Sequence, residues 1–200
     1  DLPAGEVTIS GTVTQGQTLT AANNLVDVDG MGTVTYQWLA NGQSITGATS
    51  STLTLGQDQV GKAITVRAAY TDLRGTNEAV TSTGTAAVAN VNDVPTGAIT
   101  ISGTPTQNQT LTVINTLADV DGLGAMSYQW KANGEAISGQ TGATLVLGQA
   151  QVGKAITVTA SYADGQSTPE TVTSTATASV GNVNDAPTGA VTITGKATLE

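Results

Sequence analysis

The stretch Val34-Thr35-Tyr36-Gln37-Trp38 decides the fold class, because its apolar and aromatic side chains recur at every second position. A period of two places neighbouring side chains on opposite faces of an extended chain. The stretch therefore predicts a β-strand with one buried face that carries the valine, the tyrosine and the tryptophan. The threonine and the glutamine between them predict an exposed face.

The same alternation returns in several other short runs of the first 92 residues, where valine, isoleucine, leucine and alanine alternate with threonine. Turn residues separate the runs, for example Asp29-Gly30 and Asn41-Gly42. About seven short antiparallel strands in about 90 residues predict an immunoglobulin-like β-sandwich, and no run predicts a helix of any length. The remaining runs are residues 7–10, 18–20, 53–55, 64–70 and 80–91.

The chain is an internal repeat. Residues 3–93 align with residues 95–185 at a constant offset of 92 without a gap, and 58 of the 91 aligned positions are identical. We therefore expect two tandem all-β domains, end to end, at residues 1–92 and 93–184. Residues 186–193 restart the repeat, so 185–200 is interpreted as a linker and the truncated start of a third repeat of a longer array. The last two residues, Leu199 and Glu200, depart from the repeat and are interpreted as a cloning scar.

The predicted core of each domain centres on a tryptophan. Trp38 lies in the third run, from which a side chain can pack across a sandwich onto the second and sixth strands. Alternation places Leu19 and Ile64 or Val66 opposite it, and Tyr36 is expected to be a core residue rather than a ligand platform. The chain has no cysteine, so no disulfide joins the sheets.

Composition excludes several kinds of function. The 200 residues include no cysteine and no histidine, which excludes thiol nucleophiles, imidazole bases and the metal sites that depend on these ligands. Six basic residues against 15 acidic ones give a net charge of −9, which argues against binding to nucleic acid or to an anionic membrane. No apolar stretch approaches the roughly 18 residues of a membrane span, and the first residues do not resemble a signal peptide.

The acidic residues recur in step with the repeat. Asp27 and Asp29 lie between the second and third predicted strands, and Asp72 follows the sixth. In a sandwich both loops lie at the end where the chain enters, as does Asp1 before the first strand. The second repeat places Asp93, Asp119, Asp121 and Asp164 at the equivalent positions, and Asp185 opens a third set whose partners are missing.

Clustered carboxylates repel one another unless a cation offsets their charge. A hard cation such as Ca²⁺ takes six to eight oxygen ligands from carboxylates, amides and carbonyls, whereas Mg²⁺ keeps more of its own waters. The competing interpretation is a set of solvated turn residues, because Asp-Gly is common in turns and the motif lacks the bidentate Glu of an EF-hand loop. Recurrence at a spacing of 92 favours calcium. The predicted ligands are Asp1, Asp27, Asp29, Asp72, Asn92, Asp93, Asp119, Asp121, Asp164, Asn184 and Asp185.

Four motifs together resemble the bacterial Ig-like repeats of giant Gram-negative adhesins of the repeats-in-toxin type. They are Asp-x-Asp-Gly-x-Gly, Tyr-Gln-Trp, Gln-Val-Gly-Lys-x-Ile-Thr-Val and the closing Asn-Val-Asn-Asp-x-Pro. The closing motif also resembles the calcium-binding linkers of cadherin-like domains. The resemblance covers essentially the whole chain. It implies type I secretion, display on the cell surface, calcium-stabilised extension and a spacer role, with ligand binding by other domains.

Three functions follow from these patterns. The favoured one is a calcium-rigidified spacer that acts as a monomer, contacts neighbouring repeats of its own chain, and holds a distal adhesive domain away from the cell in adhesion or biofilm formation. The alternative is an adhesive module that binds glycan or ice through rows of outward threonines, such as Thr81, Thr83 and Thr85. An enzyme is not expected, because the acids lie in small loops and a sandwich core leaves little room for a cleft. No catalytic residue is therefore assigned.

Overall fold

The structure is a computed structural model that describes residues 1–195. The chain forms two compact units. The first comprises Asp1–Val94 together with Asp119–Gly122, and the second comprises Pro95–Ala118 and the residues from Leu123 onward. The domain limits that the sequence predicts at residues 92 and 184 stay predictions.

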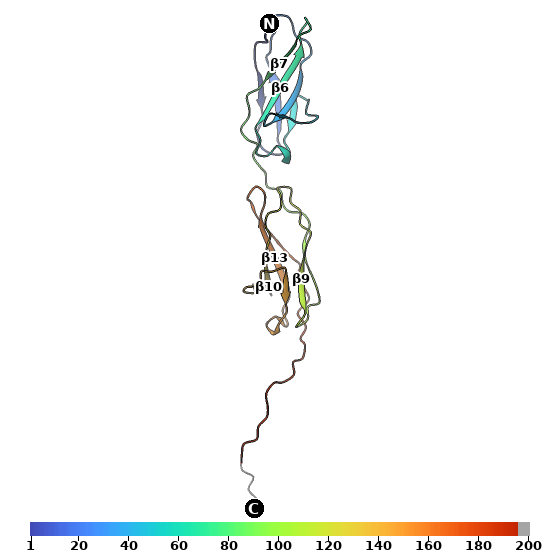
Figure 1. Ribbon diagram of the computed structural model, residues 1–200, viewed down its shortest axis with the longest axis vertical. Helices are drawn as coiled ribbons and strands as arrows, with labels where there is room; N and C mark the ends of the chain where they lie inside the picture. The colour runs from blue at the N-terminus through green and yellow to red at the C-terminus, as the bar shows by residue number, and fades with distance from the viewer. Residues whose placement is uncertain (196–200) are drawn as a thin grey trace, which may run out of the picture. The chain divides into compact units, whose positions relative to one another are not determined.

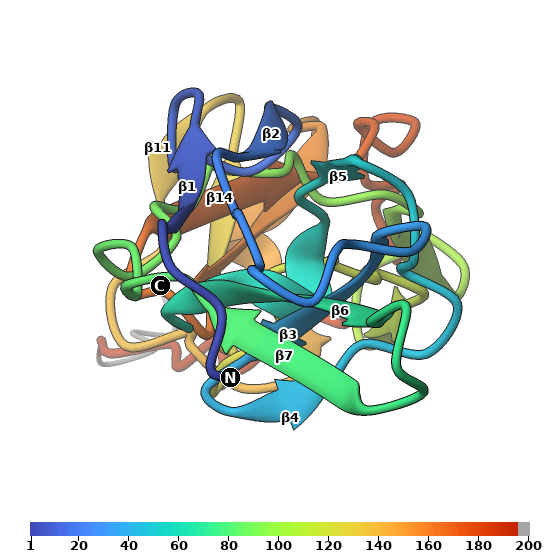
Figure 2. The ribbon, with the colours of Figure 1, turned by 90° about the horizontal axis from the view of Figure 1, so that it is seen from above.

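The first unit contains two antiparallel sheets that face each other (Figure 2). One sheet has the strand order β1-β2-β5, and the other has the order β4-β3-β6-β7. The strands are β1 (Val7–Ser10), β2 (Thr18–Asn23), β3 (Thr35–Ala40), β4 (Gln43–Ser44), β5 (Thr52–Thr54), β6 (Ile64–Thr71) and β7 (Asn77–Thr81).

The second unit repeats this arrangement, with sheets β12-β9-β8 and β11-β10-β13-β14 (Figure 1 labels β9, β10 and β13). This confirms the predicted fold class of two immunoglobulin-like β-sandwiches. The strands are β8 (Ile99–Ser102), β9 (Thr110–Asn115), β10 (Ser127–Ala132), β11 (Glu135–Ala136), β12 (Thr144–Val146), β13 (Ile156–Ala163) and β14 (Pro169–Thr173). Single turns of 3-10 helix lie at Gln57–Gln59 and Gln149–Gln151.

The two tryptophans lie at the centre of the two cores, as predicted. The Trp38 side chain is fully buried, pairs in register with Val66 of β6 and donates its indole N–H to the carbonyl of Ser50 at 2.9 Å. Trp130 is equally buried and donates to the carbonyl of Gly142 at the same distance. The hydrogen bond satisfies the one polar atom of a side chain that is otherwise apolar. Leu19 and Ile64 are fully buried in the same core.

The last predicted strand, residues 80–91, is shorter in the structure. Strand β7 ends at Thr81, because the hydroxyl oxygens of Ser82 and Thr85 accept the N–H groups of Val66 and Ile64 at 3.0 Å each. These side-chain contacts take the place of regular pairing, and the chain beyond them makes isolated bridges at Ala87, Val88 and Ala89. The bridge between Ala89 and Thr14 is parallel and joins this last run to the turn between β1 and β2.

The predicted start of a third repeat contains no strand in its described part, residues 186–195. Its apolar side chains Val191 and Ile193 are exposed. The predicted cloning scar, Leu199 and Glu200, lies outside the described residues. Within residues 1–195 no helix is long and apolar enough to span a membrane.

Candidate cation site in the acidic loops

The first acidic loop connects β2 to β3 and is shaped by its own side chains. Asp27 Oδ1 accepts the N–H of Asp29 at 2.8 Å, which closes a short aspartate turn. Gly30 follows with a φ of 83°, a conformation that favours glycine, and its carbonyl accepts the N–H of Leu73 at 3.3 Å. The loop is therefore docked onto the turn that follows β6.

The last glycine of the Asp-x-Asp-Gly-x-Gly motif has a steric reason. Gly32 donates its N–H to the carbonyl of Thr71 at 3.1 Å, and a Cβ at this position would collide with that oxygen. Gly124 approaches the carbonyl of Ala163 in the same way. The motif therefore encodes the close approach of the acidic loop to the end of β6, or of β13, where the third aspartate of each repeat lies.

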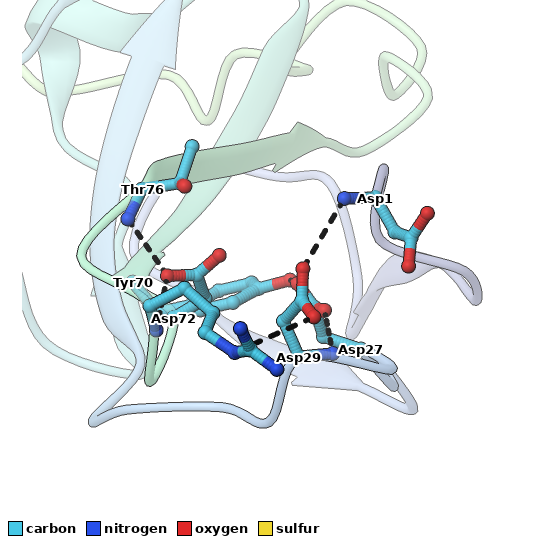
Figure 3. A network of polar contacts seen from close by, with 7 residues as sticks. Asp1, Asp27, Asp29, Tyr70, Asp72 and Thr76 are labelled. Atoms are coloured by element: carbon cyan, nitrogen blue, oxygen red, sulfur yellow. Dashed lines mark hydrogen bonds and ion pairs between the residues drawn. The ribbon is translucent and has the colours of Figure 1, made fainter.

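That third aspartate organises the turn after the strand. Asp72 is only 5 % exposed, and its Oδ1 accepts the N–H groups of Arg74 at 2.8 Å and Thr76 at 2.7 Å (Figure 3). Hydrogen bonds to the charged form favour it, so the Thr76 N–H in the first place holds the pKa of Asp72 below its usual value, and burial opposes this.

Tyr70 links the two acidic segments of the first repeat. Its hydroxyl donates to Asp27 Oδ2 at 2.7 Å (Figure 3). Burial, followed by this hydrogen bond and by the charge of Asp27, raises the pKa of Tyr70 to about 12. Both oxygens of Asp27 are therefore engaged by groups of the protein itself.

Asp29 lies near the main-chain nitrogen of Asp1 and the side chain of Arg74. The amino terminus at Asp1 donates to Asp29 Oδ2 at 3.4 Å, and Nε of Arg74 lies 3.9 Å from Asp29 Oδ1. The Asp1 carboxylate points away from the other three carboxylates in Figure 3. The first set thus brings Asp27, Asp29 and Asp72 to one end of the sandwich, and Asp1 contacts it through its main-chain nitrogen and not through its carboxylate.

Asp121 has neutral partners instead. It is 5 % exposed, its Oδ1 accepts the side-chain N–H of Gln57 at 3.0 Å, and its Oδ2 accepts the backbone N–H of the linker residue Asp93 at 2.8 Å. Asp119 Oδ1 accepts the N–H of Asp121 at 2.9 Å, as Asp27 does for Asp29. All of these residues belong to the first unit.

Asp164, in the second unit, repeats the role of Asp72. It is 5 % exposed, and its Oδ1 accepts the N–H groups of Gln166 and Thr168 at 2.8 and 2.7 Å. Its Oδ2 is buried and has no hydrogen-bond partner. An unpaired buried carboxylate oxygen is unfavourable, so this atom is suited to a cation or a water molecule.

The predicted linker ligands are placed differently from one another. Asn92 and Asn184 are exposed, and Asp93 is half-buried. The sequence predicts that the partners of Asp185 in the third repeat are missing, and this stays a prediction. Asp185 Oδ2 accepts the side-chain N–H of Gln107 of the second repeat at 3.2 Å. The partner comes from the preceding repeat, as Gln15 does for Asp93 at 3.0 Å. Residues 1–195 contain no group of three or more aspartates and glutamates arranged to hold a metal ion.

Three glutamines take part in these contacts and are missed by a search for acids: Gln15, Gln57 and Gln107. Their recurrence in step with the repeat, together with Gln149, was the available signal. The side-chain oxygens of Gln57 and Asn90 are buried and lack hydrogen-bond partners, as does Asp164 Oδ2. These are hard oxygen donors of the kind that Ca²⁺ prefers, so the donor chemistry fits calcium although the carboxylates alone do not form a cage.

The known structures to which this chain is similar match it at low sequence identity. No protein-family model matches this chain, and neither does any curated protein. The fibronectin(III)-like modules of CbhA from Clostridium thermocellum are 17 % identical over 92 % of this chain and all of theirs, with a TM-score of 0.30. A Ca²⁺-stabilized adhesin that helps an Antarctic bacterium reach out and bind ice is 15 % identical over 90 % of this chain, with a TM-score of 0.34. The match covers 50 % of the length of that adhesin chain.

Proposed function

We propose that this chain is a pair of spacer repeats from a long bacterial surface adhesin, and that calcium bound at the acidic loops stiffens the array. The observation that carries the proposal is the buried Asp121 carboxylate, which accepts the backbone N–H of the linker residue Asp93. One acidic loop is thereby tied to the linker. In this proposal the protein is secreted and displayed on the cell surface as a monomer, and a distal domain binds the ligand.

The chain's own residues do most of the positioning. Asp121 orients the linker through the N–H of Asp93, and Gln57 holds the other oxygen of Asp121. Asp119 shapes the loop by accepting the N–H of Asp121. Gln57 Oε1 is buried without a partner, so this region has a further oxygen available to a cation.

Bound calcium would supply a positive charge that neutralises the loop carboxylates and draws their oxygens together. For an extracellular-type site with a dissociation constant of roughly 10⁻⁴ M, about 1 mM calcium adds about 1.4 kcal/mol to the free energy of unfolding. The gain per site is modest, but it recurs at every linker of a long array. A chain without cysteine has no disulfides to perform this role.

The position of the aromatic side chains supports a spacer over a glycan-binding module. Trp38 and Trp130 are fully buried, Tyr70 and Tyr162 are buried, and Tyr36 and Tyr128 are half-buried. A sugar-binding platform uses exposed aromatic faces, and none of these six provides one.

The row of outward threonines, the basis of the alternative function, is irregular in the structure. Strand β7 ends at Thr81, and the Thr85 hydroxyl is engaged with the N–H of Ile64 at 3.0 Å. Thr177 does the same for Ile156 at 3.1 Å. A flat array of free hydroxyl groups is therefore interrupted in both repeats, and we do not favour direct binding of ice or glycan.

Thermal unfolding with 1 mM calcium and with chelator tests the calcium part of the proposal. We expect calcium to raise the unfolding temperature of the wild-type chain and to raise that of the double variant Asp119→Asn with Asp121→Asn by less. The variant Asp58→Asn is the matched control, because Asp58 is exposed and Ala150 occupies its position in the second repeat. A full calcium response in the double variant would show that these residues do not hold the cation.

Small-angle scattering tests the spacer part. We expect a longer and narrower distribution of particle dimensions in calcium than in chelator, because a bound cation restricts the linker. Identical scattering in the two conditions would contradict a stiffening role even if calcium binds.

A further inference from the structure

Gln15 and Gln107 occupy equivalent positions in the turn before the second strand of each repeat. The backbone N–H of Gln15 donates to the carbonyl of Ala89, and that of Gln107 donates to the carbonyl of Gly181, both at 2.9 Å. These bonds accompany the parallel bridges that join the turn to the last run of each repeat. Each glutamine is thus the last residue whose main chain pairs with the run that leaves the repeat.

The side chain of Gln15 continues this pairing. Its Oε1 accepts the N–H of Val91 at 3.1 Å, and its Nε2 donates to Asp93 Oδ2 at 3.0 Å. Gln107 makes the same two contacts: its Oε1 accepts the N–H of Val183 at 3.1 Å, and its Nε2 donates to Asp185 Oδ2 at 3.2 Å. The geometry is therefore present in each unit independently.

The spacing of the partners explains why glutamine suits the position. Residues 89, 91 and 93 are two apart, so they offer their groups on the same side of an extended run. The segment that contains the glutamine turns away from the run directly after it. The next residues, Gly16 and Asn108, have φ values of 78° and 68°. A primary amide carries one acceptor and two donor hydrogens, so it can stand in for the peptide group that a continued ladder would provide.

We infer that Gln15 and Gln107 are positioning residues that clamp the outgoing linker and hold its aspartate, Asp93 or Asp185, in place without a cation. The clamp fixes the orientation of this carboxylate at the end of the outgoing run. The calcium-binding role of this carboxylate rests on the proposed function. The clamp itself does not, because it consists of hydrogen bonds within one unit. Gln107 is 4 % exposed, so its amide is shielded from competing water.

Hydrogen exchange of two backbone amides tests the clamp in the full 200-residue chain, in chelator and without calcium. In the variant Gln107→Ala we expect the Val183 amide to exchange about fivefold faster, while the Val91 amide keeps its rate. Gln15→Ala should give the reverse pattern. Gln109→Ala is the matched control, because Gln109 is exposed in the same turn and should leave both rates unchanged.

A reversed pair separates the clamp from simple packing. In the double variant Gln107→Glu with Asp185→Asn, the glutamate can accept from Val183 and from the new asparagine, so donor and acceptor exchange places. Restored protection of Val183 supports the clamp, and exchange as fast as in Gln107→Ala overturns it. Unchanged exchange in both single alanine variants also overturns it. If Gln107→Ala unfolds the second unit, the half-buried Gln15 gives the decisive measurement in the first.

A calcium titration of the same variants distinguishes the two proposals. We expect Gln15→Ala to weaken calcium binding about tenfold, because Asp93 is no longer held in place. If the wild-type chain binds no calcium, the proposed function fails, while the exchange rates still decide whether the clamp exists.

Discussion

The loops at residues 27–30 and 119–122 have the identical sequence Asp-Val-Asp-Gly, yet their second aspartates are compensated by different chemistry. Asp29 lies beside a positive side chain, the guanidinium of Arg74. Asp121 accepts hydrogen bonds from two neutral groups, the Gln57 amide and the backbone N–H of Asp93. In both loops the donor to Oδ2 is a main-chain nitrogen at the equivalent position of the repeat, that of Asp1 in the first loop and that of Asp93 in the second.

The Asp-Val-Asp-Gly sequence therefore specifies the geometry of the loop, and the neighbouring residues determine how the charge of its carboxylates is compensated. The aspartate turn and the glycine conformation recur in both loops. The position of Arg74 in the first repeat is taken by Gln166 in the second, so the cationic partner does not recur. A loop already offset by the protein's own cations has less need of a metal ion than one surrounded by neutral donors.

We expect the largest effect from substitutions in the two cores. Unlike the loops, the cores should respond alike, because each contains a fully buried tryptophan. Trp38→Ala and Trp130→Ala each remove a fully buried side chain, and each should lower the free energy of unfolding of its own repeat by about 3–5 kcal/mol. Chemical denaturation followed by circular dichroism measures both, and the fluorescence of the remaining tryptophan identifies the transition of the unaltered repeat. A much smaller loss of unfolding free energy in one repeat would mean that the two sandwiches are not equivalent. A difference between the loops could then come from the sandwiches that carry them.

The effect of calcium on stability tests the difference between the two loops directly. In 1 mM calcium, Asp121→Asn should lose about 1.4 kcal/mol of calcium-dependent stability, because asparagine removes the charge and leaves one accepting oxygen in place of two. Asp29→Asn should lose less, since Arg74 already offsets part of the charge of that carboxylate. Denaturant midpoints with and without calcium give both values. Equal losses would show that the protein's own cations do not distinguish the loops.

Acid should act on the first loop's neighbour, Asp72. Its pKa in the folded state is lowered, so the stabilisation it contributes is present above the pKa of the unfolded chain and is lost as pH falls through the folded value. The affected window lies below about pH 4. Asp72→Asn should flatten the acid limb of a stability–pH profile. A profile that keeps its slope below pH 4 would assign the acid sensitivity to other carboxylates.

The smallest effect concerns Arg74 itself. Arg74→Gln installs the residue found at position 166 and makes the first loop resemble the second. The Arg74 side chain is 77 % exposed and 3.9 Å from Asp29, so we expect the free energy of unfolding to change by less than about 0.5 kcal/mol. Measurements at low and high salt check this, because an exposed ion pair weakens with ionic strength. A loss above 1 kcal/mol would assign Arg74 a structural role.

Much of the fold was predictable from period and repeat. The alternation around Trp38 and Ile64 predicted the buried faces of the strands, and Gly30 predicted a turn. Both features are determined by residues that are neighbours in the sequence. The end of β7 was not predictable, since Ser82 and Thr85 continue the alternation while their hydroxyls replace the ladder.

The candidate site was only partly predictable. Topology placed Asp27, Asp29 and Asp72 at one end of the first sandwich, as expected. The partners of Asp29 and Asp121 could not be predicted, because Arg74 and Gln57 come from segments whose approach depends on packing. The pairing of Asp185 with Gln107 was missed for a related reason: a neutral amide carries no charge signal, and 78 residues separate the two.

The parallel pairing between the last run and the turn before β2 has a mechanical consequence. Tension applied to the linker pulls the run along its own axis, so the bonds at Ala89, Val91 and Asp93 are loaded in shear. Bonds loaded in shear share the force and must break together, whereas an antiparallel hairpin opened from its end breaks one bond at a time. A repeat anchored this way is suited to bear load at the point where the chain leaves it.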